Sequence, residues 1–190
     1  MKTPKLLSIA GLVVLLSGCA AEVVSSKAIT IPSNTFNKIN VVYSQQHLKV
    51  ENGKDSYLEV ESTKFGNGIL KTLPEIYKKN GISSASGKIQ NEETLGNEKL
   101  KELFHEEKSE VPVLVVTPVA AEITCYQTCI TKFSVKTSLY ELTQGRINKT
   151  LWTAIINLPT PLTVFSSYDG VAEKLANITL ERMKADGVIK

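Results

Sequence analysis

The sequence predicts a two-layer α/β domain with a mixed, mostly antiparallel sheet and helices packed on one face of the sheet. Three observations lead to this fold class. Several segments alternate apolar and polar residues as strands do, others space apolar residues as helices do, and residues 111–119 form an apolar stretch that fits a central strand covered on both faces. The order of these segments, without an internal repeat, favours one sheet with helices packed against it.

The expected strands are alternating or β-branched segments bounded by turn residues. They cover residues 39–43, 48–50, 57–60, 111–119, 133–142 and 147–158. The second and third of these segments flank Asn52-Gly53 and predict a hairpin. The last two flank a turn around Gly145 and predict a long antiparallel hairpin that ends at Pro159.

The expected helices carry apolar residues three or four positions apart. They cover residues 69–80, 99–108 and 166–187, and residues 82–97, rich in Ser, Gly and Asn, are expected to run over the surface. Pro74 cannot donate a hydrogen bond to the carbonyl four residues before it, so the first helix is either kinked or starts late, with Thr72 and Glu75 as a capping box. In the last helix, Ser166 and Asp169 form an N-terminal capping signature and Gly187 ends the helix.

The N-terminal residues have the features of a bacterial export signal. Lys2 and Lys5 precede an apolar run over residues 6–16, which is shorter than the roughly 20 residues that a spanning helix needs. The run closes in Leu16-Ser17-Gly18-Cys19, which resembles the lipobox of bacterial lipoproteins. This resemblance implies that Cys19 becomes the N-terminal residue and carries acyl chains, and that Ala20 after it directs the protein to the outer membrane. The alternative is an ordinary secretory peptide with a chance cysteine.

These features divide the chain into three parts. We expect residues 1–18 to be a lipoprotein signal peptide, residues 19–37 a lipidated flexible tether, and residues 38–190 a single α/β periplasmic domain. The formal charge of the whole chain is only +3, and Lys2 and Lys5 leave with the signal, so no strong electrostatic field is available to bind nucleic acid. No second apolar run is long enough to span a membrane.

Two cysteines, Cys125 and Cys129, remain in the mature chain after Cys19 is lipidated. In an oxidising compartment a disulfide is the natural expectation, but a continuous strand separates residues four apart by about 13 Å, farther than the roughly 7 Å that a disulfide spans. The chain must therefore turn at residues 126–128. Free thiols are one alternative, and a metal site is another that would need two further ligands, whereas the two histidines, His47 and His105, are isolated.

The hairpin over residues 138–152 has a strand that ends in a turn with Gly145 and Arg146, and a return strand that carries Trp152. It resembles the hairpin of small outer-membrane lipoproteins, among them the penicillin-binding-protein activator lipoproteins of the LpoB type and the periplasmic domain of the curli secretion lipoprotein. The closing helix, residues 175–187, is similar to theirs. This resemblance implies a protein that binds other envelope proteins and is not an enzyme. Without the resemblance, Trp152 is explained as a core residue.

The residues themselves offer little chemistry. We find no Ser with a placed His and Asp, and Gly66-Asn67-Gly68 matches no phosphate-loop spacing, so no enzyme activity, cofactor or metal is expected. A hydrolase would have to use carboxylates such as Glu106 and Glu107, which more often form a solvated helix face. The function expected is a non-catalytic adaptor that docks onto a larger envelope assembly. The alternative is a binder of a small cell-wall ligand, using a groove near one of three aromatic residues, namely Tyr126, Tyr140 or Trp152.

Overall fold

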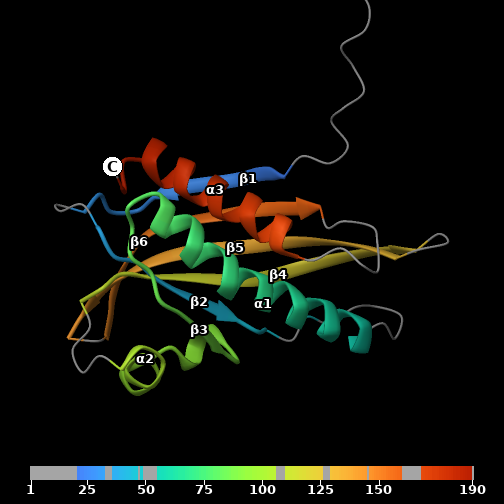
Figure 1. Cartoon of the computed structure of the whole chain (residues 1–190), viewed down its shortest axis with the longest axis horizontal. Coiled ribbons are helices and arrows are strands. Elements are labelled where there is room, and N and C mark those ends of the chain that lie inside the picture. The colour runs from blue at the N-terminus through green and yellow to red at the C-terminus, as the bar shows by residue number, and fades with distance from the viewer. Residues whose placement is uncertain are drawn as a thin grey trace, which may run out of the picture.

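One six-stranded sheet organises the chain. The computed structural model describes residues 21–32, 36–46, 48, 55–105, 110–125, 129–144, 146–159 and 168–189. The strands are β1 (Glu22–Ala28), β2 (Asn40–Ser44), β3 (Ser86–Ile89), β4 (Val113–Cys125), β5 (Cys129–Thr143) and β6 (Arg146–Pro159), and the helices are α1 (Asp55–Lys79), α2 (Asn97–Phe104) and α3 (Asp169–Ala185) (Figure 1). A 3-10 turn spans Glu92–Thr94.

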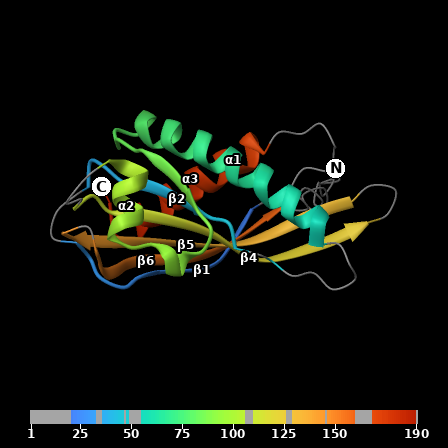
Figure 2. The ribbon, with the colours of Figure 1, turned by 90° about the horizontal axis from the view of Figure 1, so that it is seen from below.

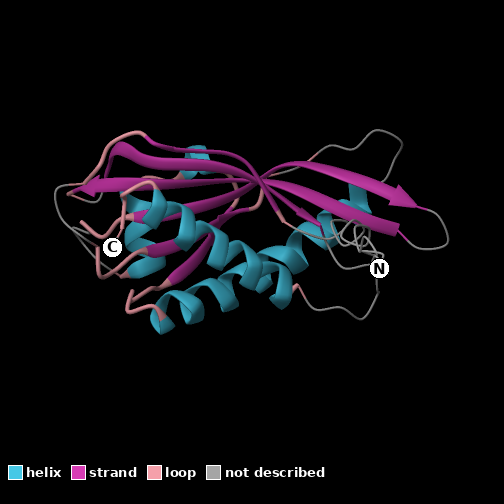
Figure 3. Ribbon diagram, turned by 90° about the horizontal axis from the view of Figure 1, so that it is seen from above, coloured by secondary structure: helices cyan, strands magenta, loops and turns pink. Residues whose placement is uncertain are grey.

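The sheet is mixed, with the order β1-β6-β5-β4-β2-β3. The strand β2 is parallel to β3 and β4, and the remaining pairs are antiparallel. The long helices α1 and α3 lie side by side on one face of the sheet, which Figure 3 shows edge-on. The predicted α/β class, with a mixed sheet and a helix layer, is therefore confirmed.

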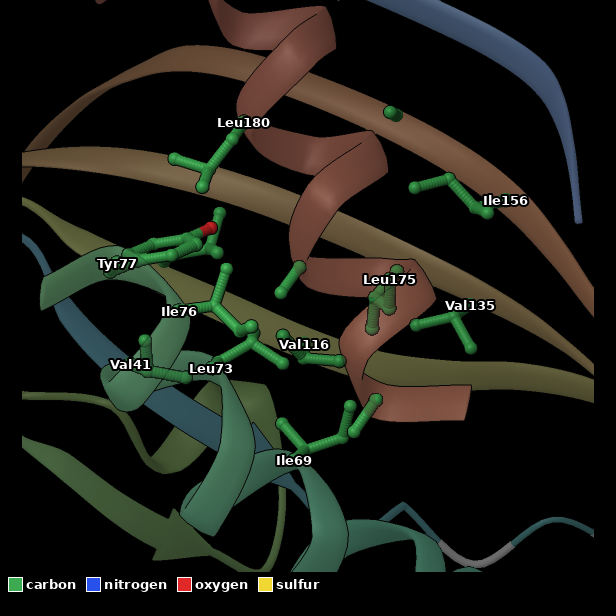
Figure 4. Close-up of a cluster of buried hydrophobic side chains, with 14 of the residues drawn as sticks. Val41, Ile69, Leu73, Ile76, Tyr77, Val116, Val135, Ile156, Leu175 and Leu180 are labelled. Atoms are coloured by element: carbon green, nitrogen blue, oxygen red, sulfur yellow. The ribbon is translucent and has the colours of Figure 1, made fainter. Parts of the chain in front are cut away.

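The main core lies between this helix layer and the sheet. Tyr43, Tyr77 and Trp152 are its largest side chains, and each is fully buried. Figure 4 shows how Leu73 and Ile76 of α1 and Leu175 of α3 converge on strand residues of the sheet. Each such side chain contributes about 1.5–3 kcal/mol when it is fully buried, so this layer supplies most of the driving force for folding.

The helix α1 is much longer than the sequence predicts. It begins at Asp55, so the hairpin expected over residues 48–60 is wrong for its second strand, and the helix continues through Pro74. Pro74 leaves the carbonyl of Leu70 without its helical donor. The hydroxyl of Ser86 on β3 donates a 2.8 Å hydrogen bond to that carbonyl. A side chain from the neighbouring strand therefore replaces the missing backbone donor.

The short helix α2 packs on the opposite face of the sheet from α1 and α3 (Figure 2). Its Leu100 is buried, and Leu103 and Phe104 pack beside it against a second apolar cluster. The strand residues of that cluster alternate along β2 and β4 with the residues that face the main core, as Val42 and Val115 do. The strands β2 and β4 are thus covered on both faces, as the continuous apolar run over residues 111–119 predicts.

Two segments expected to lack regular structure contain strands. The expected tether over residues 19–37 is wrong for Glu22–Ala28, because β1 pairs with β6 in antiparallel register, with Glu22 opposite Asn157 and Ala28 opposite Trp152. The expected surface stretch over residues 82–97 contains β3, which pairs with β2. In each case the backbone hydrogen bonds of a distant strand provide order that the local composition does not predict.

The C-terminal half matches the sequence closely. The strands β5 and β6 form the long hairpin expected there, and α3 ends before Gly187, whose φ of 73° is the left-handed conformation that a glycine adopts freely. The helix starts at Asp169, and Ser166, expected as its cap, lies outside the described residues.

Candidate functional site

A groove lies between α2 and the start of β6. It has a volume of about 590 Å³ and is open to solvent. We call it the α2 groove, and its lining residues are Thr94, Gly96, Glu98, Lys99, Glu102 and Arg146. Residues far apart in sequence therefore meet here, because the 3-10 turn, α2 and the start of β6 come together at one end of the sheet.

The lining of the α2 groove is charged, with both signs present. The ammonium of Lys99 forms a 2.8 Å ion pair with Glu102 one helical turn later. The charged groups of Glu98 and Arg146 pair with no other residue in the part of the chain that the structure describes. An exposed ion pair of this kind contributes about 0.2–1 kcal/mol to stability, so these charges are better suited to recognition than to holding the fold.

Beside the groove, Glu92 receives hydrogen bonds from three side chains on the face of the sheet that carries α2. We call this face, opposite α1 and α3, the outer face. Tyr140 donates its hydroxyl proton to Glu92, Lys136 lies 3.3 Å from the same carboxylate, and Thr117 donates to it at 3.3 Å. We call these four residues the Glu92 cluster. It fixes the 3-10 turn, and with it one wall of the α2 groove, to the strands β4 and β5.

The environment of the Glu92 cluster favours the neutral form of its tyrosine. Burial, followed by the hydrogen bond to the Glu92 carboxylate and the charge of that carboxylate, raises the pKa of Tyr140 to about 12. Tyr140 therefore stays protonated at physiological pH and acts as a hydrogen-bond donor.

The rest of the outer face of the sheet is polar and largely uncovered. Ser134 donates to Asn157 at 2.7 Å, and Ser138 and Thr153 share a 3.2 Å hydrogen bond. Ile155 is 38 % exposed on the same face, beside Lys136. These two pairs satisfy the hydrogen-bonding groups of the strand side chains that form them.

The structure places the sequence-predicted aromatic residues in different surroundings. Tyr140 lies on the outer face in the Glu92 cluster, next to the α2 groove. Trp152 is buried in the main core, and its indole N–H donates a 2.7 Å hydrogen bond to Asp186 after α3, so its interpretation as a core residue is confirmed. Tyr126 lies outside the described residues. Tyr140 and Trp152 therefore lie on opposite faces of the sheet.

The cysteine pair is placed by its backbone. Cys125 lies opposite Cys129 in the antiparallel register of β4 and β5, so the predicted turn between them is confirmed. Their side chains, and Cys19, lie outside the described residues, and the disulfide and the lipid attachment remain predictions.

The remaining candidates carry little chemistry. Glu106, Glu107 and His47 lie outside the described residues, and His105 is exposed directly after α2. Among the residues that the structure describes, no three His, Cys, Asp or Glu side chains group as metal ligands. None of the described helices has the length and apolar character needed to cross a bilayer.

The Glu92 cluster and the α2 groove could not be predicted from a local sequence pattern, because their members lie in separate elements.

No protein-family model matches the sequence, and no curated protein matches it. Among solved structures, the chain is similar to the PelC dodecamer from Paraburkholderia phytofirmans, with 14 % identity over 84 % of this chain and 96 % of that one, at a TM-score of 0.46. It is also similar to the lipoprotein GNA1162 from Neisseria meningitidis, with 13 % identity over 77 % of this chain and 99 % of that one, at a TM-score of 0.40. A third match is protein XCC0632 from Xanthomonas campestris, with 10 % identity over 84 % and 94 % of the two chains and a TM-score of 0.39. With TM-scores below 0.5, these matches establish neither the family nor the function of the chain.

Proposed function

We propose that the chain is a lipid-anchored protein of the bacterial cell envelope that acts as a non-catalytic adaptor and docks onto a larger envelope assembly. The observation that carries this proposal is the motif Leu16-Ser17-Gly18-Cys19 at the end of a short apolar run that follows two lysines. Three acyl chains on one cysteine anchor a protein firmly, since each buried methylene contributes about 0.8 kcal/mol. Ala20 after the cysteine favours the outer membrane, with the domain in the periplasm.

The α2 groove is the proposed docking surface. It is open, and its lining holds acidic and basic side chains, of which Glu98 and Arg146 have no partner among the described residues. Charges of both signs at a surface give specificity for a partner of complementary pattern and speed its association. The resemblance of the hairpin over residues 138–152 to that of envelope-protein activators supports a protein partner.

Capture of the partner tests the adaptor function. Tagged, acylated protein is recovered from solubilised envelopes, and a partner is expected in fixed stoichiometry. Arg146→Glu reverses one charge in the groove and should lower the recovery of that partner several-fold. Lys174→Glu makes the same change on the exposed face of α3 and serves as the matched control. No stoichiometric partner, or equal loss in both variants, would count against docking through the α2 groove.

A second candidate function is the binding of a small cell-wall ligand. The observation that favours it is the volume of the α2 groove, about 590 Å³, which is within the range of about 300–1,000 Å³ for small-molecule sites. Such sites are usually apolar and enclosed, whereas this groove is charged and open, so the adaptor function is preferred. Calorimetric titration of the purified domain with muropeptides separates the two, because heat of binding that Arg146→Glu abolishes would support the ligand.

A further inference from the structure

Only a few residues of sequence separate Cys19, the proposed anchor, from the sheet. Three residue steps separate Cys19 from Glu22, the first residue of β1. A fully extended chain covers about 3.3–3.6 Å per residue, so this connection reaches at most about 11 Å. Acyl chains on Cys19 would therefore hold the starting end of β1 next to the bilayer.

The hairpin of β4 and β5 extends beyond the sheet at that same end. Glu22 lies opposite Asn157, which lies opposite Ser134 on β5. The strand β5 begins at Cys129, five residues before Ser134, so it extends about 17 Å beyond the level of Glu22. Figure 1 shows this hairpin extending past the start of β1. The overhang is longer than the tether.

The composition of the overhanging end fits contact with lipid headgroups. The described residues of this end, 123–125 and 129–131, contain no Asp, Glu, Lys or Arg, and they include Ile123 and Ile130. The first charges on either side, Glu122 and Lys132, lie opposite each other and form a 3.6 Å ion pair. Charged side chains are costly in a bilayer, whereas an uncharged segment can lie at its interface. The start of β1 itself is less suited to this contact, since Glu22 is exposed there.

We propose that the end of the β4–β5 hairpin, residues 123–125 and 129–131, rests on the lipid bilayer in which Cys19 is anchored. This inference rests on the proposed function, because it requires acyl chains on Cys19. The contact is at the headgroup level, since a hairpin end has unpaired backbone edges that hydrocarbon does not tolerate. The β5–β6 turn and the α2 groove, at the opposite end of the sheet, then point away from the membrane toward a partner.

Two matched tryptophan variants of the acylated full chain test this orientation. Ile130→Trp adds a fluorophore at the hairpin end, and Ile147→Trp adds one at the opposite end of the sheet, where Ile147 is 38 % exposed. Each protein is reconstituted into vesicles of phosphatidylethanolamine and phosphatidylglycerol that contain spin-labelled headgroups, and Trp152 in the unaltered protein provides the background. We expect the added emission of Ile130→Trp to be quenched and that of Ile147→Trp to be unchanged.

Hydrogen exchange of the unaltered acylated protein provides a measurement without an added aromatic side chain. Backbone amides at residues 129–131 should exchange more slowly in vesicles than in detergent, and those at residues 146–150 should not change. Equal quenching of the two variants, or equal exchange in both media, would overturn the inference and leave the proposed function standing. A mature chain without acyl groups on Cys19 by mass spectrometry would overturn both.

Discussion

The hydroxyl of Ser86 on β3 donates a 2.8 Å hydrogen bond to the carbonyl of Leu70, the helical acceptor that Pro74 leaves without a donor. This bond links α1 to an edge strand of the sheet and explains how a proline is accommodated inside a long helix. Ser86→Ala removes the donor and should lower the free energy of unfolding by about 0.5–1.5 kcal/mol, measured by denaturant titration.

A double-mutant cycle makes this prediction specific. Pro74→Ala restores a backbone N–H that can donate to Leu70, so Ser86→Ala should cost less in that background than in the parent. Equal costs in the two backgrounds would show that the hydroxyl of Ser86 does not replace the missing helical donor.

Two helical glycines form a matched pair for testing the packing of the core. A Cβ at Gly66 in α1 would lie 2.3 Å from the ring of Tyr43, which is buried and donates its hydroxyl to the Ser62 carbonyl. Gly66→Ala should therefore destabilise the protein by about 1–3 kcal/mol despite the higher helix propensity of alanine. Gly170 in α3 has nothing within 4 Å of the same position, and Gly170→Ala should be neutral or stabilising. Thermal unfolding of both variants checks this, and a stable Gly66→Ala protein would contradict the described packing.

The sequence of α1 does not predict the full length of the helix. The apolar spacing of Ile69, Leu73 and Ile76 predicts the second half of the helix, but Gly66 and Gly68 lower the local helix propensity before it and conceal the first half. Burial of Phe65 against Tyr43 and Phe133 outweighs that propensity. The packing of a helix on a sheet decides its length here, and local sequence does not.

The strands also differ in how well the local sequence predicts them. The long strands β5 and β6 follow from alternation and a turn, because hairpin partners are neighbours in sequence. The strand β1 pairs with β6 more than 120 residues later, as in the pair Ala28 and Trp152, and its own residues alternate weakly. The Glu92 cluster draws on the 3-10 turn, β4 and β5, so no local pattern could predict it.

The stability of the fold should fall at alkaline pH partly through Tyr140. Its pKa is raised from 10.0 to about 12 in the folded protein, mainly by burial and then by Glu92, so the folded state holds this proton more tightly than the unfolded state. The stabilisation is complete below pH 10 and is lost as the pH rises from 10 to 12. Burial also raises the pKa of Tyr43 and Tyr77, which adds to the loss. Tyr140→Phe should show a shallower decline over this range in denaturant titrations at successive pH values, and an identical decline would refute the role of Tyr140.

The opposed backbones of Cys125 and Cys129 support a disulfide between them. Without reductant, the mature protein should be lighter by two hydrogen atoms than after reduction, and alkylation should fail. A loop of this length contributes about 2 kcal/mol to stability through the unfolded chain, so reductant should lower the denaturation midpoint. The double variant Cys125→Ser with Cys129→Ser should match the reduced protein and be insensitive to reductant. Ready alkylation of the native pair would end the disulfide proposal.

Mass spectrometry of the N-terminal peptide of the mature protein, isolated from membranes, shows whether Cys19 carries the lipid anchor. We expect a chain that begins at Cys19 and carries acyl groups on the sulfur and the amine, and a Cys19→Ser variant whose precursor is not processed and carries no acyl groups. A mature chain that begins at another residue, or one that begins at Cys19 with an unmodified thiol, would contradict this expectation.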